Sequence, residues 1–482
     1  MRERLRPEYA IAVVYVASMF MNALDTTVVN VALPTLRREF DAQTGVEWLV
    51  TGYLLSLAAW IPASGWIGDR FGNKATFLTA MAIFTIARAA CGAAQTLEQA
   101  VALRIIQGIG GGMMIPVGFA MLMRAFPPEK RAQVARILIV PSVIGPASGP
   151  VIGGFLIDTL SWRWVFLVTL PLGIATFIFG WVFLREHKEP RPGAFDLPGF
   201  VLSAGGLALL LFSLSSGPQR GWSSPISWGS GIAGLVAFTL LVVVELQRAE
   251  PMLNFRLIKD RLFRTAMLAG TFSTGAFLGI LFLMPQFLQQ VRGVSALQSG
   301  LATFPEAVGV LFGSQIAGRL YLTVGPRRLM ASGLGAVTFW LFLIAGVDTE
   351  TNLWVVRVLM FCVGASMSFV FLPMQACVFA RMKPADMGNA SAIYNAQRQV
   401  AAALGVAVLA TVLALRFPGA NEGLPSAEFV SRQVGAFRDV FLLAAAFALA
   451  GAVLSLFIRD SDAAATMRPR QVAVKETAAA AD

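Results

Sequence analysis

An acid and an arginine inside apolar runs carry the chemistry that this sequence suggests. Asp25 lies within the first long apolar run, and Arg104 lies within a later one, with Gln107 one turn further on the same face. If these runs cross a membrane, each buried charge costs at least ~2.5 kcal/mol, so it is a functional candidate. An ion pair that breaks when the acid takes up a proton would act as a proton switch. A static structural ion pair is the alternative interpretation.

Glu306 is a second acid inside an apolar run. It follows the helix-kinking Pro305 within the run 297–318. We interpret it as a second protonatable group or as a binding site for a cationic substrate, and solvation near a membrane interface is the alternative. Arg88 and Arg357 lie closer to the ends of their runs, so their side chains are expected to extend to the interface.

Polar residues at helical spacing accompany these charges, in one stripe around Asp25 and in another around Arg398. Each stripe recurs at steps of three and four residues, which places its members on one helix face. Lipid cannot satisfy such groups, so both faces are expected to line a cavity. The candidate cavity and substrate residues are Asn22, Thr26 and Asn30 in the first stripe, Ser391, Asn395, Arg398 and Gln399 in the second, and Gln107 beside Arg104.

The elements that must hold these residues are membrane-spanning helices. The chain is 56% hydrophobic and only 13% charged, with a mean hydropathy of +0.69, whereas soluble proteins carry roughly 25% charged residues. A spanning helix needs ~20 mainly apolar residues, and the first run is too long for the apolar region of a signal peptide. The sequence predicts an all-α polytopic membrane protein with fourteen spans, at about 9–33, 47–66, 75–95, 100–123, 134–157, 164–184, 197–216, 227–246, 263–288, 297–318, 328–347, 352–380, 387–414 and 436–458.

Lysine and arginine residues predict the orientation of these spans. Cytoplasmic loops carry the excess of positive charge. With the N-terminus inside, the inner segments hold 26 of the 38 Lys and Arg residues and the outer segments hold 8. The bias predicts a multi-pass protein of the cell (inner or plasma) membrane with both termini in the cytoplasm. It also explains the net charge of +11, so nucleic acid is not expected as a partner.

A charged segment, GWIGDRFGNK at 65–74, joins the second and third runs. Gly68 and Gly72 suit a tight turn because glycine tolerates positive φ and close backbone approach. Asp69 is expected to meet an arginine or the positive end of a helix. Arg70 and Lys74 are expected to face water or lipid headgroups. The gating candidates in this segment are Gly65, Asp69, Arg70, Gly72 and Lys74.

A weaker copy of this segment lies at 318–327. Gly318, Gly325 and Arg327 keep the offsets of two glycines and the lysine, but Leu322 stands at the position of Asp69. The copies follow spans two and ten, so two six-helix halves require the spans 197–216 and 227–246 to be an insertion. Paired halves around a cavity are typical of transporters. The predicted units are a six-helix bundle at 8–190, the inserted pair at 191–250, a second bundle at 251–460, and a disordered cytoplasmic tail at 461–482.

The fifth run, with PSVIGPASGPVIGGF, has glycine at four-residue steps. Gly145, Gly149 and Gly153 form a small-residue face that lets helices approach closely. Pro146 and Pro150 remove backbone donors, which predicts a bend where the two halves meet.

Other kinds of chemistry lack support in the sequence. The three cysteines have neither disulfide-framework nor metal-site spacing, and a single histidine argues against a histidine-built site. No phosphate-binding loop of the Gly-x-x-x-x-Gly-Lys-Ser/Thr type occurs, so ATP is not expected as the energy source. The glycine-rich segment 108–112 lies in an apolar run, where packing is a better interpretation than dinucleotide binding. We expect no enzyme, metal or cofactor.

These motifs together resemble the major facilitator superfamily, specifically its fourteen-helix drug:proton antiporter branch, over about residues 8–460. GWIGDRFGNK is similar to the family's signature between helices two and three. LDTTVVNVALP (24–34) is similar to the first-helix signature of the branch, with its acid at Asp25. LRIIQGIGGG (103–112), GPASGPVIGG (145–154), WRWVF (162–166) and MGNASAIYNAQRQV (387–400) also resemble this branch.

The resemblance implies alternating access by two six-helix bundles, driven by inward proton flow without a cofactor. It implies an inner charge relay at Asp69 and Arg70, one-sided because of Leu322, and proton coupling at Asp25 with Arg104. The leading prediction is an exporter of amphipathic, drug-like small molecules. A dedicated exporter of one endogenous metabolite or antibiotic is the runner-up, and a nutrient importer is a further alternative. Relatives of this branch can have a periplasmic accessory partner, but no segment here indicates one.

Overall fold

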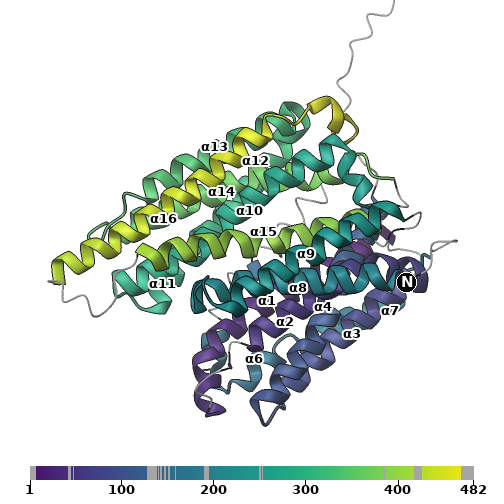
Figure 1. Cartoon of the computed structure of the whole chain (residues 1–482), viewed down its shortest axis with the longest axis horizontal. Coiled ribbons are helices and arrows are strands. Elements are labelled where there is room, and N and C mark those ends of the chain that lie inside the picture. Colours follow the sequence, from purple (N-terminus) through teal and green to yellow (C-terminus); the bar gives the residue numbers. More distant parts are fainter. Residues whose placement is uncertain are drawn as a thin grey trace, which may run out of the picture.

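The apolar runs of the sequence form long helices in the computed structural model (Figure 1). The structure describes residues 7–41, 45–46, 48–126, 138, 141, 144–145, 148–149, 152–157, 159–188, 195–248, 251, 253–383, 386–416 and 426–467. In these ranges, 13 helices are long and apolar enough to cross a membrane, and each overlaps a predicted span. Of the remaining prediction, 134–157, half of the residues lie outside the described ranges. The all-α polytopic fold is therefore confirmed.

The first half of the chain is packed around α4. Its helices are α1 (Pro7–Glu39), α2 (Trp48–Phe71), α3 (Asn73–Cys91), α4 (Leu97–Ala125), α6 (Arg163–Leu167) and α7 (Leu170–Phe183). A Cβ on Gly112 would lie 2.3 Å from the Leu57 carbonyl oxygen of α2, and one on Gly110 would lie 2.5 Å from the Ala80 oxygen of α3. The glycine-rich segment 108–112 therefore serves close helix packing, as the sequence indicated.

The second half contains η2 (Phe255–Lys259), α10 (Arg261–Gln286), η3 (Phe287–Val291), α11 (Ala296–Thr303), α12 (Pro305–Val324), α13 (Pro326–Ile344), α14 (Leu353–Phe379), α15 (Met387–Arg416), α16 (Ser426–Ser455) and η5 (Asp460–Thr466). The helix break before Pro305 matches the predicted kink, because proline cannot donate the backbone bond that would continue α11. The expectation of disorder from residue 461 is wrong for η5, which the Tyr321 hydroxyl holds by a 2.5 Å hydrogen bond with Thr466.

Between the halves, α8 (Leu197–Arg220) and α9 (Pro225–Gln247) occupy the positions predicted for the inserted pair. We call them the inserted hairpin. α8 packs on α9, on α2 of the first half and on α15 of the second.

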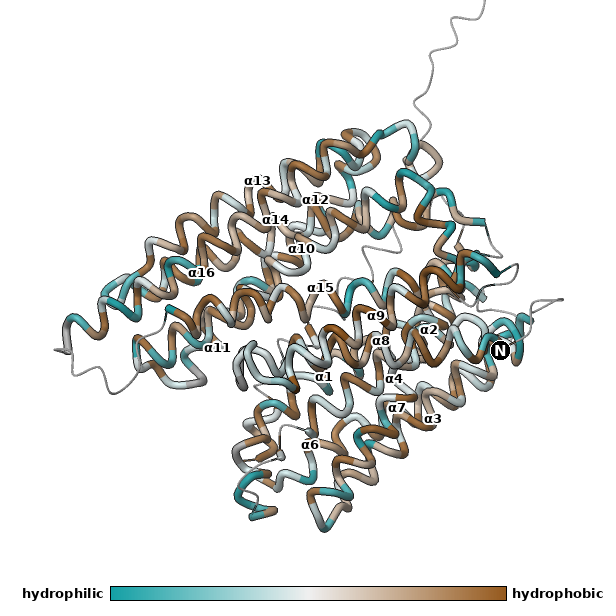
Figure 2. The backbone as a smooth tube through the Cα atoms, viewed as in Figure 1, coloured by the Kyte–Doolittle hydropathy of each residue, from teal (hydrophilic) through white to brown (hydrophobic). Residues whose placement is uncertain are grey.

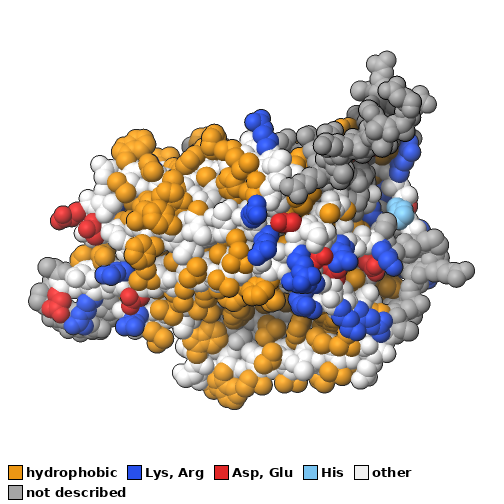
Figure 3. Space-filling view, turned by 90° about the horizontal axis from the view of Figure 1, so that it is seen from above, with side chains coloured by type: hydrophobic (Ala, Val, Ile, Leu, Met, Phe, Trp, Pro, Cys, Tyr) orange, Lys and Arg blue, Asp and Glu red, His pale blue; other side chains and the backbone are white. Residues whose placement is uncertain are grey.

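Both described chain ends lie at one end of the helical body, on the right in Figure 1, and we call this the terminal end. The halves contact one another through α15, which packs on α2 and α4. Their ribbons diverge toward the opposite end. Hydrophobic residues line the helix shafts and hydrophilic residues collect at the helix ends (Figure 2). Apolar side chains cover much of the surface in Figure 3, as expected for a protein whose solvent is lipid.

Candidate functional site

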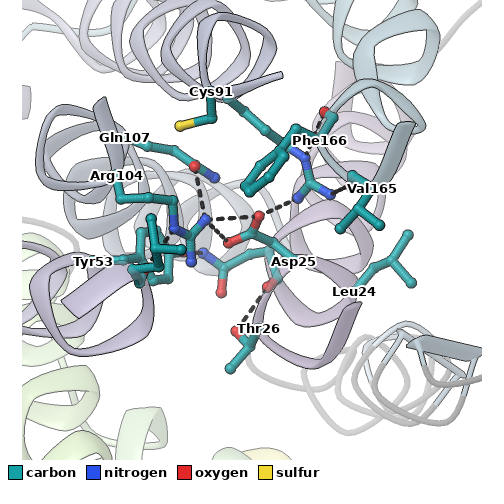
Figure 4. Close-up of polar contacts among 12 residues, drawn as sticks. Leu24, Asp25, Thr26, Tyr53, Cys91, Arg104, Gln107, Val165 and Phe166 are labelled. Carbon is teal, nitrogen blue, oxygen red and sulfur yellow. Dashed lines mark hydrogen bonds and ion pairs between the residues drawn. The ribbon is translucent and has the colours of Figure 1, made fainter. Parts of the chain in front are cut away.

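A buried cluster of three charged residues lies in the first half, away from the terminal end. Asp25 of α1 is fully buried and accepts hydrogen bonds from Arg104 Nη1 of α4, at 2.7 Å to Oδ2 and 3.0 Å to Oδ1. Arg88 Nη1 of α3 donates to the Oδ1 atom of the same carboxylate. The predicted contact between Asp25 and Arg104 is therefore present (Figure 4), but the acid lies between two arginines. We call these residues the Arg–Asp–Arg cluster.

Arg88 does not extend to the membrane interface, so that expectation was wrong. Its side chain is 1% exposed. Besides Asp25, the guanidinium donates to two backbone oxygens at α6, to Val165 at 2.8 Å and to Phe166 at 3.0 Å. These two residues belong to the WRWVF motif, which explains what that motif does in the fold. No spacing in the sequence indicated this contact, because its partners lie 63 to 78 residues away.

Arg104 is held by several further contacts. Its Nε donates to the Leu49 oxygen at 2.8 Å and its Nη1 to Gln107 Oε1 at 2.8 Å. Its guanidinium carbon lies 4.2 Å from the centre of the Tyr53 ring, a cation–π contact. The Tyr53 hydroxyl accepts from Asn22 Nδ2 at 2.8 Å. Gln107 is fully buried, so it belongs to the charged cluster and does not line a cavity in this conformation.

The other cavity candidates differ in exposure. On α1, Asn30 is exposed and Thr26 is partly exposed, donating to the Asn22 oxygen at 3.1 Å. On α15, Arg398 and Gln399 are partly exposed. Asn395 is 7% exposed and donates to the Ser391 oxygen at 2.9 Å, so it faces other protein groups and not an open cavity here.

The small-residue face of the fifth run packs on α1. A Cβ on Gly145 would lie 2.7 Å from the Ala23 Cβ atom, and one on Gly149 would lie 2.0 Å from Thr27 Oγ1. A Cβ on Gly153 would lie 3.4 Å from the Val28 oxygen. These glycines therefore contact the helix that carries Asp25. Pro146 and Pro150 lie outside the described residues.

The segment 65–74 is mostly helical, contrary to the expected loop. Residues 65–71 form the last turns of α2, and α3 begins at Asn73, so Gly72 alone makes the turn, with φ +101. Gly68 is helical and serves close approach instead: a Cβ there would lie 2.9 Å from Asn73 Oδ1. Gly72 lets the chain turn within one residue, because it donates to the Gly68 oxygen of α2 while its own oxygen accepts from Thr76 of α3.

Asp69 lies where the two halves meet, at the terminal end. Its Oδ1 forms a 3.0 Å ion pair with Arg124 Nη2 of α4. Its Oδ2 lies 3.3 Å from the place of a Cβ on Gly388, in the first turn of α15, and Gly65 packs on the same glycine. Asp69 therefore meets both an arginine and a helix N-terminus, where a negative charge is stabilised.

Lys74 is partly exposed, with its ammonium bound to backbone oxygens, whereas Arg70 is exposed as predicted. The Lys74 ammonium donates to the Trp181 and Leu184 oxygens at the end of α7, each at 2.8 Å. A cation is favourable there because the last carbonyls of a helix have no partner within it.

An acid caps the third membrane-spanning helix of each half, α3 in the first and α13 in the second. The Glu186 carboxylate, just after α7, accepts from the backbone nitrogens of Lys74 and Ala75 at 3.0 Å. In the second half, Asp460 Oδ1, just after α16, accepts from the Arg327 nitrogen at 2.9 Å. Gly325 has φ +87 there, as Gly72 has in the first half. The repeat therefore extends to these two acids. The second half still has no acid that corresponds to Asp69, because Leu322 stands at that position.

Direct contacts hold the halves together toward the terminal end. Ser391 Oγ of α15 donates to the Pro116 oxygen of α4 at 2.9 Å. The Phe119 ring of α4 lies 4.8 Å from Phe379 of α14 and 6.3 Å from Tyr394 of α15, between ring centres. This end of the boundary is closed by apolar packing.

Glu306 lies in the second half, at the start of α12. It is 2% exposed, and neither carboxylate oxygen has a hydrogen-bond partner among the described residues. The interpretation of a solvated residue near an interface is therefore wrong. An ionised carboxylate without a partner is costly to bury, so this group needs a proton or another cation. The described residues contain no group of three acids, histidines or cysteines that could hold a metal ion.

The sequence matches the family model described as Major Facilitator Superfamily over residues 15–406. It is 31% identical over 415 residues to a "Multidrug resistance protein B homolog" of Mycobacterium tuberculosis, which covers 84% of this chain and 76% of that protein. A "Putative multidrug resistance protein MdtD" of Cronobacter sakazakii is 31% identical over 399 residues, with 82% and 84% covered.

Solved structures have a similar fold. The human organic anion transporter MFSD10 superimposes with a TM-score of 0.64 at 17% identity, over 92% of this chain and all of that chain. The proton:xylose symporter XylE superimposes with a TM-score of 0.60 at 15% identity, over 93% and 94%.

Proposed function

Because this chain belongs to the Major Facilitator Superfamily and is therefore a membrane transporter, we propose that it exports amphipathic, drug-like compounds in exchange for protons. The names of the relatives support a multidrug substrate range. The proton gradient is the energy source, with no cofactor. The terminal end faces the cytoplasm, as the distribution of Lys and Arg predicts.

The observation that carries this proposal is the Arg–Asp–Arg cluster. Two guanidinium groups hold one carboxylate in a fully buried position. Protonation of Asp25 would leave two buried like charges close together without an anion, which is strongly unfavourable. The cluster therefore cannot take up a proton and stay as it is. Proton uptake has to be accompanied by separation of α1 from α3 and α4.

This separation gives a physical link between the proton and the change of access. In this conformation the cytoplasmic end of the boundary is closed by Phe119, Phe379 and Tyr394, and Asp69 of α2 lies against the first turn of α15. A shift of α1 acts on the fifth run through Gly145 and Gly149, which contact α1 closely. The substrate loads after the closed end opens, and proton release to the cytoplasm re-forms the cluster.

Glu306 serves this cycle as a second protonatable group. It is buried with no hydrogen-bond partner in the part of the chain that the structure describes, and a proton is the cation that such an enclosed position admits. The alternative, a subsite for cationic substrates, requires that the conformational change expose this carboxylate.

Dye efflux in everted vesicles tests the proposal. We expect active uptake of amphipathic dyes into the vesicles when a proton gradient is applied, and collapse of uptake when an ionophore removes the gradient. Dye uptake at the same rate with and without the proton gradient would overturn proton coupling. A panel of unrelated cationic and neutral dyes separates a multidrug exporter from an exporter of one metabolite. Substrate entry accompanied by alkalinisation outside intact cells would instead indicate an importer.

A further inference from the structure

The inserted hairpin is held together as one unit. Ser213 Oγ of α8 donates to the Ser227 oxygen of α9 at 2.7 Å. In the middle of the hairpin, a Cβ on Gly234 would lie 2.8 Å from the Leu210 nitrogen, so the two backbones are in close contact. At the terminal end, Arg248 Nη1 pairs with Asp196 Oδ1 at 2.8 Å. The two helices are therefore tied at both ends and in the middle, and we expect them to move together.

This unit covers the boundary between the two halves. Leu207 and Leu211 of α8 are buried together with Ala58 of α2, and Ala396 and Ala403 of α15 pack on the same cluster. The outer helix α9 exposes large apolar side chains, including Ile232, Leu235 and Val236, as expected for contact with lipid. α8 therefore separates the α2–α15 boundary from the bilayer.

The contacts with α2 are aromatic pairs at three levels. Pairs of aromatic rings add roughly 0.5–1.5 kcal/mol each beyond their burial, and their geometry is specific. Because the pairs are spread along the whole of α2, they resist both sliding and tilting. The ring-centre distances are 6.0 Å for Trp48 with Phe212, 5.4 Å for Trp60 with Phe200, and 4.8 Å for Trp66 with Phe195, just before α8.

The contacts with α15 differ in kind. Ala396, Val400 and Ala403 of α15 lie against α8, and these aliphatic side chains interlock less than the aromatic pairs on α2. The polar contact is a 2.6 Å hydrogen bond from Trp222 Nε1, in the turn between α8 and α9, to Thr411 Oγ1 near the end of α15. A hydrogen bond of this type has a net worth of only about 1 kcal/mol, so it can break during a cycle.

We infer that the inserted hairpin travels with the first half as a wall, and that α15 slides along it while the wall keeps the α2–α15 boundary closed to lipid. This inference rests on the proposed alternating-access cycle. It gives the two additional helices a function: amphipathic compounds dissolved in the bilayer do not enter between α2 and α15.

Cross-linking in full-length protein tests this inference. In a background in which Cys91, Cys362 and Cys377 are replaced by serine or alanine, one variant carries Ala58→Cys with Leu207→Cys, joining α2 to α8. The matched variant carries Ala403→Cys with Leu211→Cys, joining α15 to α8. Both are treated with a short, reducible reagent that joins two thiols, and dye efflux is measured before treatment, after treatment and after reduction.

We expect the α2–α8 cross-link to leave efflux within about twofold of the untreated variant, and the α15–α8 cross-link to reduce it at least tenfold, with recovery on reduction. Inhibition by the first cross-link, or full efflux with the second, would overturn the inference. Absence of gradient-driven efflux in the unmodified protein would instead count against the proposed function.

A second readout does not depend on efflux by the cysteine variants. The rate of cross-linking between α15 and α8 should change several-fold when substrate dye is added or the pH is shifted, whereas the rate between α2 and α8 should stay constant. Equal responses of the two pairs would overturn the inference even if both variants were inactive in transport.

Discussion

Arg88 and Arg104 bind the same carboxylate of Asp25 from two different helices, α3 and α4. One acid therefore joins three helices of the first half, and the cluster carries a net positive charge when the acid is ionised. With two arginines on one carboxylate, α1 packs in this position only while Asp25 is ionised. A single ion pair would make the packing of α1 depend less strongly on the charge of Asp25.

The first prediction concerns charge balance in this cluster. Asp25→Asn leaves two buried guanidinium groups without an anion, which should lower the free energy of unfolding by about 3–5 kcal/mol. The double variant Asp25→Asn with Arg88→Gln removes one of these charges and should recover a substantial part of the loss. Thermal unfolding of detergent-purified protein measures both. Glu350→Gln, at an exposed position, is the control; equal melting of the single and double variants would contradict the account.

Arg88→Lys tests the geometry of the second arginine. A lysine has the same charge but lacks the planar group that reaches Asp25, Val165 and Phe166 together. We expect a loss of about 2–3 kcal/mol in unfolding free energy. Arg357→Lys is the matched control, because Arg357 stacks on the exposed Trp354. An unchanged melting temperature for Arg88→Lys would mean that the charge alone matters.

The turn between α2 and α3 should not tolerate a side chain. Gly72 has φ +101, and a Cβ there would lie 2.4 Å from the Glu186 carboxyl group. Gly72→Ala should therefore cost about 1–3 kcal/mol in stability. Gly335→Ala, in α13 where nothing lies within 4 Å of the added atom, should be neutral or slightly stabilising. Melting curves of the two variants in one detergent provide the comparison.

Asp69→Asn should affect the cycle more than the fold. In the ion pair with Arg124, the Arg124 side chain is 12% exposed and the Asp69 side chain is 15% exposed. Loss of this partly exposed pair should change the free energy of unfolding by about 1 kcal/mol or less. Efflux should nevertheless fall strongly, because the same carboxylate lies against the start of α15, where the two halves meet. Arg70→Gln, an exposed neighbour, is the comparison. Normal efflux by Asp69→Asn would reduce the segment to a simple connector.

Glu306→Gln should leave the fold intact, because the amide is neutral and has the same shape as the protonated acid. If Glu306 carries a proton in the cycle, accumulation of neutral and cationic dyes should depend less steeply on the proton gradient. Efflux is measured at several gradients with both classes of dye. Selective loss of cationic dyes at an unchanged gradient dependence would instead identify a subsite for cations.

The long, strongly apolar spans and the internal repeat were readable from the sequence, because membrane helices must satisfy their backbone internally and so follow composition closely. The contact between Asp25 and Arg104 was also predictable, since few charges were available inside apolar runs. Arg88 was missed because its position near a helix end is equally compatible with a side chain at the interface. Its burial depends on two carbonyl groups of α6, which no local pattern encodes.

The segment 65–74 shows the same limit. Asp69 and Gly72 predicted a charged turn. The length of helix on either side of the turn depends on capping by Glu186, which lies 112 residues from Lys74. The matching cap at Asp460 also comes from far along the chain, 133 residues from Arg327. Tertiary hydrogen bonds of this kind decided the local structure, and they lie outside what spacing along the chain can reveal.

Proton movement in proteoliposomes tests the central claim most directly. With purified protein and a pH-sensitive dye enclosed in the vesicles, addition of substrate should drive proton flux opposite to the substrate. The charge-balanced variant Asp25→Asn with Arg88→Gln, if it remains folded and binds substrate, should show no such flux. Substrate-driven proton flux of normal size in that variant would contradict the role of the Arg–Asp–Arg cluster in proton coupling.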